Sequence, residues 1–119
     1  MIIAVDFDGT IVRHKFPEIG EEIPNAINIL KFFQGLGHQI IIWTCREEKY
    51  LNDAITFLNG RGFYPDAINE NIIDLIEYSP RKIYADIYVD DRNFPSFIED
   101  MWENLRDKIL IETISRKNL

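Results

Sequence analysis

The alternation of short apolar segments with amphipathic patterns constrains the fold of this chain more than any other feature. Three segments have the Ile, Val and aromatic content of buried strands: residues 2–7, 39–44 and 82–91. Apolar residues at helical spacing predict helices over 24–38 and 47–63, and residues 64–70 have room for one short strand. The order β-α-β-α-β predicts a parallel sheet joined by right-handed crossovers.

A further helix is predicted near the end of the sequence. Ser96 and Glu99 have the spacing of a capping box, and apolar residues then follow on one helical face: Ile98, Met101, Trp102 and Leu105. Together the elements predict an α/β protein with a Rossmann-like, doubly wound parallel sheet in three α/β/α layers. With 119 residues, the chain fits a single domain over residues 1–119 and has no room for a second domain that covers a substrate.

Composition excludes several classes of function. The net charge of −7 argues against broad binding to nucleic acid or to anionic membranes, which depends on clustered Lys and Arg. Cys45 is the single cysteine, so an intrachain disulfide and a thiolate metal cluster are both excluded. The first six residues lack the basic start of a signal peptide and no apolar run has membrane-spanning length, so we expect a cytoplasmic protein.

Two acidic pairs follow predicted strands. Asp6 and Asp8 lie in "VDFDGT", and Asp90 and Asp91 follow the strand expected over 82–91. In parallel sheets, ligands bind beyond the carboxyl ends of the strands, so these side chains are expected to converge. Four converging carboxylates would have strongly raised pKa values unless a cation were bound. A hard divalent ion with oxygen ligands satisfies such a site, and Mg²⁺ fits better than Zn²⁺.

The same residues carry a resemblance to a known family. "DFDGT" resembles motif I (D-x-D-G-T) of the haloacid-dehalogenase-like (HAD) hydrolase superfamily. Thr44 resembles the motif II threonine, Lys82 the motif III lysine, and "YVDD" over 88–91 the acidic pair of motif IV. The resemblance implies a HAD-like core. Because successive motifs are separated only by one helix and a short loop or connection, it implies a member without a cap domain.

The resemblance implies a Mg²⁺-dependent phosphatase, a phosphomonoesterase, with a role for each matching residue. Asp6 would attack phosphorus and form an aspartyl-phosphate, and Asp8 would protonate the leaving oxygen and later activate water. Gly9 would let backbone N–H groups approach the phosphoryl oxygens. Thr44 would hydrogen-bond the phosphate, and Lys82 would supply positive charge.

The metal ligands implied by the resemblance are Asp6, the backbone carbonyl of Asp8, and Asp90 as the main ligand from motif IV. Asp91 is either a second ligand or an orienting group. Asp86 lies roughly 13 Å back along the strand from Asp90, so we expect it to be structural.

Basic and imidazole side chains cluster near the expected mouth of the site: Arg13, His14, Lys15, Arg46 and Arg92. We expect Arg46 to bind phosphate. The cluster either recognises a second anionic group or consists of ordinary solvated loop charges, and the two interpretations carry equal weight. Thr44 has a second interpretation as well, because Thr44 and Glu47 have the spacing of a capping box for the next helix.

The main alternative is a receiver-like or regulatory domain that binds phosphate without turnover. A receiver would carry its phosphoacceptor aspartate at the end of its third strand, after an acidic pair on the first, whereas here the middle strand ends in Thr44. We expect a phosphorylated substrate, a small molecule rather than a nucleic acid. A homo-oligomer is a further option, because a neighbouring subunit would cover an open site.

Overall fold

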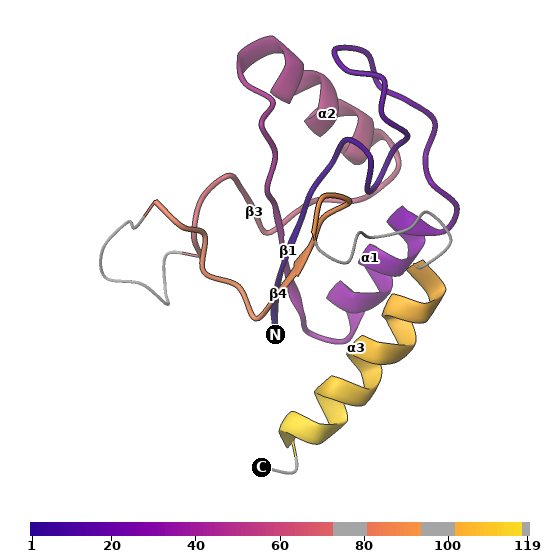
Figure 1. The fold of residues 1–119 in the computed structure, drawn as a ribbon, viewed down its shortest axis with the longest axis vertical. Coiled ribbons are helices and arrows are strands. Elements are labelled where there is room, and N and C mark those ends of the chain that lie inside the picture. The colour runs from indigo at the N-terminus through magenta and orange to yellow at the C-terminus, as the bar shows by residue number, and fades with distance from the viewer. Residues whose placement is uncertain (73–80, 94–101, 118–119) are drawn as a thin grey trace.

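A parallel sheet forms the centre of the fold (Figure 1). The computed structural model describes residues 1–72, 81–93 and 102–117. In these residues the sheet has the strand order β3-β2-β1-β4, with the strands β1 (Ile2–Val5), β2 (Gln39–Ile42), β3 (Ala67–Ile68) and β4 (Ile87–Val89). All pairs are parallel, as the alternating sequence pattern predicts.

The direction of winding reverses at β1. The chain runs outward from β1 to β2 to β3, and then returns across the sheet to place β4 on the free side of β1. Ile3 therefore pairs with Ile40 on one side and with Ile87 on the other. This is the Rossmann-like, doubly wound α/β arrangement expected from the sequence, and the small chain fits a core without a cap domain. The carboxyl ends of β1 and β4 lie next to each other at the reversal, where open α/β sheets bind ligands.

Three helices of the described residues cover one face of the sheet: α1 (Ala26–Gly35), α2 (Glu48–Gly60) and α3 (Trp102–Lys117). Helices α1 and α3 lie side by side (Figure 1). The buried cluster joins all three to the sheet and includes Ile3, Val5, Ile40, Ile42, Leu30, Phe33, Leu58, Trp102 and Ile109. Each large apolar side chain buried there contributes about 1.5–3 kcal/mol to folding.

The opposite face of the sheet has its own smaller core. Ile2, Ala4 and Ile41 point to this side, because successive strand residues alternate between the two faces. The connection between β3 and β4 covers them with residues that include Ile72 and Ile83. Both faces are therefore apolar, which explains why the strands read as continuous hydrophobic runs.

The strands are shorter than the sequence pattern predicts. β1 ends at Val5 rather than at residue 7, and β2 ends at Ile42 rather than at residue 44. β4 is confined to Ile87–Val89, because the residues before it cross the second face of the sheet: Ile83 is buried there and Tyr84 donates its N–H to the side chain of Asn71.

The described residues test only part of the prediction of a last helix. The capping box at Ser96 and Glu99 lies outside the described residues. The described part of the last helix buries Trp102 and, partly, Leu105, as expected. Among the described helices, none combines the length and the apolar character needed to cross a membrane.

Candidate functional site

Three carboxylates converge at the carboxyl ends of β1 and β4. Asp6 follows β1, and its N–H donates to the carbonyl of Val89 at 2.9 Å. Asp90 and Asp91 follow β4. One carboxylate oxygen from each of Asp6, Asp90 and Asp91 lies within 4.8 Å of the other two. The predicted convergence of the two acidic pairs is therefore found for three of the four side chains.

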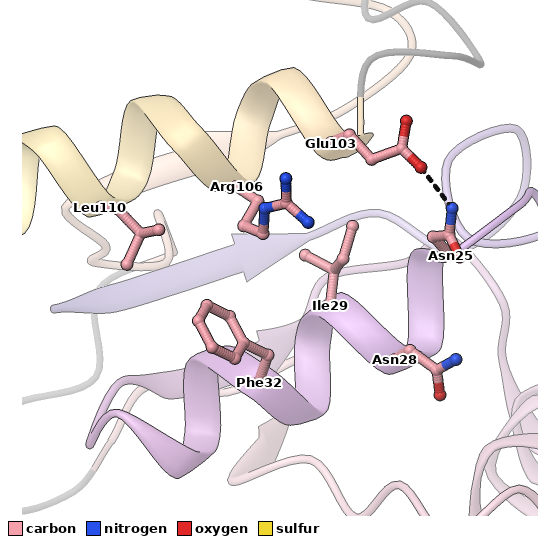
Figure 2. Close-up of a pocket in the computed structure, with 7 residues that line it drawn as sticks. All are labelled: Asn25, Asn28, Ile29, Phe32, Glu103, Arg106 and Leu110. Carbon is pink, nitrogen blue, oxygen red and sulfur yellow. Dashed lines mark hydrogen bonds between the residues drawn. The ribbon is translucent and has the colours of Figure 1, made fainter.

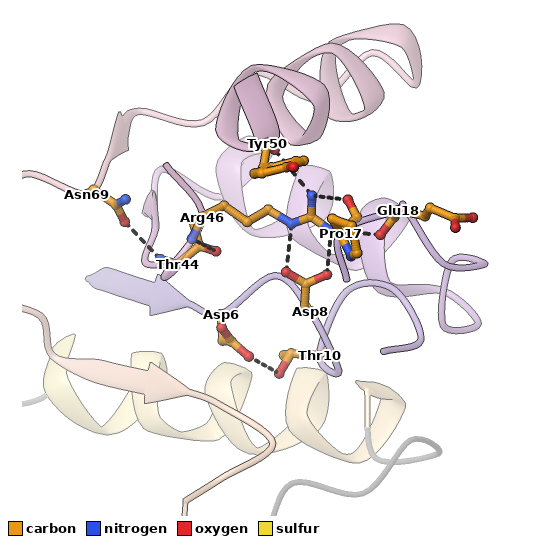
Figure 3. A network of polar contacts seen from close by, with 9 residues as sticks. All are labelled: Asp6, Asp8, Thr10, Pro17, Glu18, Thr44, Arg46, Tyr50 and Asn69. Atoms are coloured by element: carbon orange, nitrogen blue, oxygen red, sulfur yellow. Dashed lines mark hydrogen bonds and ion pairs between the residues drawn. The ribbon is translucent and has the colours of Figure 1, made fainter. Parts of the chain in front are cut away.

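Thr10 organises this cluster, although the sequence analysis gave it no role. Its buried hydroxyl donates to Oδ2 of Asp6 at 3.2 Å (Figure 3). The same hydroxyl accepts the N–H of Asp91 at 3.0 Å. The Nε1–H of Trp102 donates to the Thr10 carbonyl at 2.9 Å, which attaches α3 to the loop. The signal that could have revealed Thr10 is its place as the last residue of "DFDGT".

The environment of Asp6 raises the pKa of its carboxyl to about 8. Burial is the largest cause, followed by the charge of Asp90 and by the hydrogen bond and charge of Asp91; the hydrogen bond from Thr10 acts in the opposite direction. Crowded carboxylates of this kind favour either a proton or a cation between them. Their oxygen donors suit a hard divalent cation.

Gly9 allows Asp91 to approach the loop. Its φ of +87° lies in the left-handed region, and a Cβ at this position would overlap the Asp91 carboxylate. Its N–H donates to the carbonyl of Val12 at 2.8 Å. The glycine thus serves the packing of the acidic cluster as well as the shape of the loop.

Asp8 turns away from the cluster and pairs with Arg46. In Figure 3 the Asp8 side chain extends towards Arg46, whereas Asp6 turns towards Thr10. Nε of Arg46 donates to Oδ2 of Asp8, and Nη2 donates to Oδ1, both at 2.7 Å. This is a two-pronged ion pair, with the Asp8 side chain 13% exposed and that of Arg46 only 1% exposed.

Every N–H of the Arg46 guanidinium has a protein acceptor. Besides Asp8, the acceptors are the carbonyls of Pro17, Glu18 and Tyr50, at 2.8–3.2 Å. In this arrangement Arg46 has no N–H left for a phosphate. The expectation that Arg46 binds phosphate directly is therefore not met, because its partners within the protein already use all five donors.

Thr44 lies just beyond the end of β2, as predicted. Its N–H donates to Oδ1 of Asn69 at 2.8 Å, and its hydroxyl accepts the N–H of Arg46 at 3.2 Å. The expected capping box of Thr44 with Glu47 is wrong: Glu47 itself is the N-cap of α2 and makes no side-chain capping bond. Asn69 was not predicted; its φ of +53° is one that asparagine tolerates better than most residues.

Lys82 and Asp86 lie on the approach to β4. The exposed Lys82 places its ammonium over the ring of Tyr88, 5.7 Å from the ring centroid. Within the described residues it makes no ion pair with the acidic cluster. Asp86 accepts the N–H of Ile2 at 2.8 Å and pairs with Arg116 at 3.0 Å, which confirms the structural role expected for it.

The remaining basic residues near the site lie in exposed loops. Arg13 contacts Glu21 at 3.9 Å and Lys15 contacts Glu18 at 3.6 Å. His14 and Arg92 are exposed. Recognition of a second anionic group by these side chains stays a prediction.

A hollow of about 490 Å³ lies away from the acidic cluster, between α1 and α3 (Figure 2). It is lined by Asn25, Asn28, Ile29, Phe32, Glu103, Arg106 and Leu110. Asn25 and Glu103 are joined by a hydrogen bond across its end. None of the residues predicted for the functional site contributes to this hollow.

The fold and the acidic edge together define a Rossmann-like α/β protein with a candidate cation site. The sequence matches no protein-family model and no curated protein. Among solved structures, it is similar to a conserved protein from Bacteroides thetaiotaomicron, with a TM-score of 0.87 and 40% sequence identity over 94% of this chain and 91% of that one. The chain belongs to the same family as that Bacteroides protein.

Proposed function

We propose that the protein is a Mg²⁺-dependent phosphatase of the HAD type that works through an aspartyl-phosphate on Asp6. The observation that carries the proposal is the approach of Asp6, Asp90 and Asp91 within 4.8 Å of one another at the carboxyl edge of the sheet. These residues belong to motifs I and IV of the resemblance, which come from distant parts of the sequence and meet only through the fold.

The carboxylates that would hold Mg²⁺ are Asp6, Asp90 and Asp91, with the backbone carbonyl of Asp8. When bound, the ion would neutralise charge on the phosphoryl oxygens and keep Asp6 ionised at neutral pH. An oxygen of Asp6 then attacks phosphorus, and the bond from phosphorus to the leaving oxygen breaks. Asp8 gives that oxygen a proton, and in the second step takes one from the water that releases phosphate.

Two other residues have proposed roles in binding the phosphoryl group. Thr44 lies at the end of β2, one strand away from Asp6, and would hydrogen-bond the phosphate. Lys82 would supply positive charge, for which its ammonium has to leave the ring of Tyr88 and turn towards the site.

Two substitutions test the proposal, both in residues 6–10, which we call the nucleophile loop. Asp6→Asn keeps the shape of the side chain but removes the attacking anion, so phosphate release should fall to background and no phospho-enzyme should form. Asp8→Asn keeps the nucleophile and should lose roughly 10²–10⁴ in rate. With an aryl phosphate, whose leaving group needs little protonation, Asp8→Asn should still accumulate phospho-enzyme.

The measurement is phosphate release with Mg²⁺ present or removed by excess chelator, together with mass spectrometry of the trapped protein. Full activity in chelator would remove the metal from the mechanism. Turnover by Asp6→Asn near the unmodified rate, or a phosphoryl group trapped on Asp90 or Asp91, would show that Asp6 is not the nucleophile.

The pairing of Asp8 with Arg46 favours a second candidate, a phosphate-binding domain without turnover. Both Asp8 oxygens already accept hydrogen bonds from a guanidinium, so fewer of their lone pairs are left for a proton that Asp8 could give to a leaving group. This candidate predicts that beryllium fluoride, a phosphate analogue, binds at Asp6 with Mg²⁺ while no phosphomonoester is hydrolysed. Fluorine NMR and phosphate release on the same sample separate the two candidates.

The acidic composition supports a small phosphorylated substrate rather than a nucleic acid, and we place the protein in the cytoplasm. With no cap over the acidic edge, a neighbouring copy of the chain is the proposed cover for a small substrate.

A further inference from the structure

The guanidinium of Arg46 uses all of its hydrogen-bond donors within the protein. Its side chain is 1% exposed and its five N–H groups reach two oxygens of Asp8 and three backbone carbonyls. The rings of Phe7 and Phe16 lie against the guanidinium, at 5.3 and 5.1 Å from its central carbon. Because no donor is left for a ligand, the guanidinium acts by holding other parts of the protein in place.

The contacts of Arg46 join three separate segments. Asp8 belongs to the nucleophile loop, Pro17 and Glu18 to the loop that follows it, and Tyr50 to the first turn of α2. Backbone carbonyls of a loop and of α2 therefore fix the position of the guanidinium. The guanidinium in turn fixes the position of the Asp8 carboxylate. Two parallel charge-assisted bonds fix the plane of a carboxylate as well as its distance.

The ion pair does not exhaust what Asp8 can do. An ionised carboxylate offers about four lone-pair directions, and the two-pronged pair with Arg46 uses two of them. The other two remain for the proton that Asp8 would give to the leaving-group oxygen and later take from a water. The Asp8 side chain is 13% exposed, so solvent reaches part of it although Arg46 is fully buried.

We propose that Arg46 is a positioning residue, which holds the Asp8 carboxylate in the place from which it acts on the leaving group. The proposal rests on the proposed function of Asp8 and adds a residue that the motif resemblance does not include. It replaces the expectation that Arg46 itself binds phosphate.

Steady-state kinetics of five variants test the proposal: R46M, R46K, D8N, the double variant D8N/R46M, and R61M. Each is assayed with 4-nitrophenyl phosphate, which has a good leaving group, and with a simple alkyl phosphate, which needs a proton on its leaving oxygen. R46M should lose about 10–100-fold in kcat on the alkyl phosphate, the usual cost of removing an orienting partner, with a smaller loss on the aryl phosphate and little change in KM. In the D8N background the same substitution should have no further effect.

R46K and R61M serve as controls. Lysine restores the charge of Arg46 but not the planar pair of donors, so R46K should recover activity only in part. R46K and D8N/R46M do not leave a partly buried Asp8 carboxylate without a cation, so they keep the test informative if R46M fails to fold. Arg61 is matched to Arg46 because it too lies against a phenylalanine ring (Phe57, 3.8 Å) and near a carboxylate (Glu22, 3.6 Å), but outside the site, so R61M should keep wild-type kcat.

Two kinetic outcomes would overturn the proposal. One is effects of R46M and D8N that multiply, and the other is an R46M effect confined to KM, which would indicate substrate binding by Arg46. Absence of phosphatase activity in the wild type would instead reject the proposed function. The positioning role is then decided by crystal structures of R46M and R46K. The Asp8 carboxylate should leave its present place in R46M, and an Asp8 that stays there would overturn the proposal.

Discussion

Asp6 and Asp8 are one residue apart in sequence, yet their surroundings are opposite. Asp6 lies among carboxylates, and its pKa is raised to about 8. Each carboxylate oxygen of Asp8 accepts one N–H of Arg46. Environment rather than residue type sets the role of a carboxyl group, which is why the proposed mechanism gives these two aspartates different steps.

The raised pKa of Asp6 predicts how stability depends on pH. In the unfolded chain this carboxyl has a pKa near 3.9, and in the folded protein about 8. Folding is therefore favoured by the protonated form, so the contribution of Asp6 to stability is fully present below about pH 4 and is lost as the pH rises through about 8. In chelator, the urea midpoint of the wild type should fall over this range.

Asp6→Asn is the control for that titration, because an amide does not ionise. The variant should lack this part of the decline, and saturating Mg²⁺ should reduce it in the wild type by binding the ionised cluster. An identical pH slope in wild type and Asp6→Asn would show that another group causes it.

At the scale of elements, a buried hydrogen bond attaches α3 to the loop that follows β1. The indole of Trp102, the first residue of α3, donates to the carbonyl of Thr10, and the Thr10 hydroxyl contacts Asp6 and Asp91. Trp102→Phe keeps an aromatic ring but leaves that carbonyl without its indole donor. We expect a loss of about 1–3 kcal/mol in the free energy of unfolding, measured in urea.

Trp43→Phe is the matched control, because Trp43 lies partly exposed beyond β2. A substitution at such a site should change the free energy of unfolding by less than about 0.5 kcal/mol. Equal effects of the two substitutions would contradict a specific role for the bond from Trp102 to Thr10.

The order and direction of the elements could be predicted from sequence, whereas their ends could not. Apolar runs and helical spacing identify β1, α1, β2 and α2, since both depend on which residues are buried. The Ile, Val and aromatic content of residues 82–91 predicts one strand, but only Ile87–Val89 pair with β1, although Ile83 is as buried as Val89. A buried residue and a strand-paired residue are both apolar, so the sequence pattern does not separate them.

The site was predictable to the extent that strand ends determine it. The convergence of Asp6, Asp90 and Asp91 follows from parallel strands alone. The direction in which Asp8 turns depends on Arg46, and the position of Arg46 depends on contacts with the loop at Pro17 and Glu18 and with helix α2. Contacts of that kind come from tertiary structure and have no period that a sequence pattern could reveal.

At the scale of the whole molecule, one buried cluster connects all three described helices to the sheet. We expect unfolding in a single transition, with far-ultraviolet circular dichroism and tryptophan fluorescence giving the same midpoint. Phe33→Ala should lower the free energy of unfolding by about 3–5 kcal/mol, because Phe33 is 0% exposed in this cluster.

Phe32→Ala is the control on the same helix, with a side chain that is 43% exposed. It should cost much less than Phe33→Ala. Midpoints that differ between the two spectroscopic signals would show that one part of the molecule unfolds independently of the rest.

The central position of β1 has a consequence for synthesis on the ribosome. Val5 pairs with Val89, so β1 has to wait for β4, which follows β2 and β3 in the sequence, before its second edge is covered. The acidic cluster cannot assemble until that pairing forms, however early Asp6 is made. Sequence-distant pairing of this kind slows folding. Until Val89 emerges, the nascent chain presents one unpaired edge of the apolar strand β1 to chaperones.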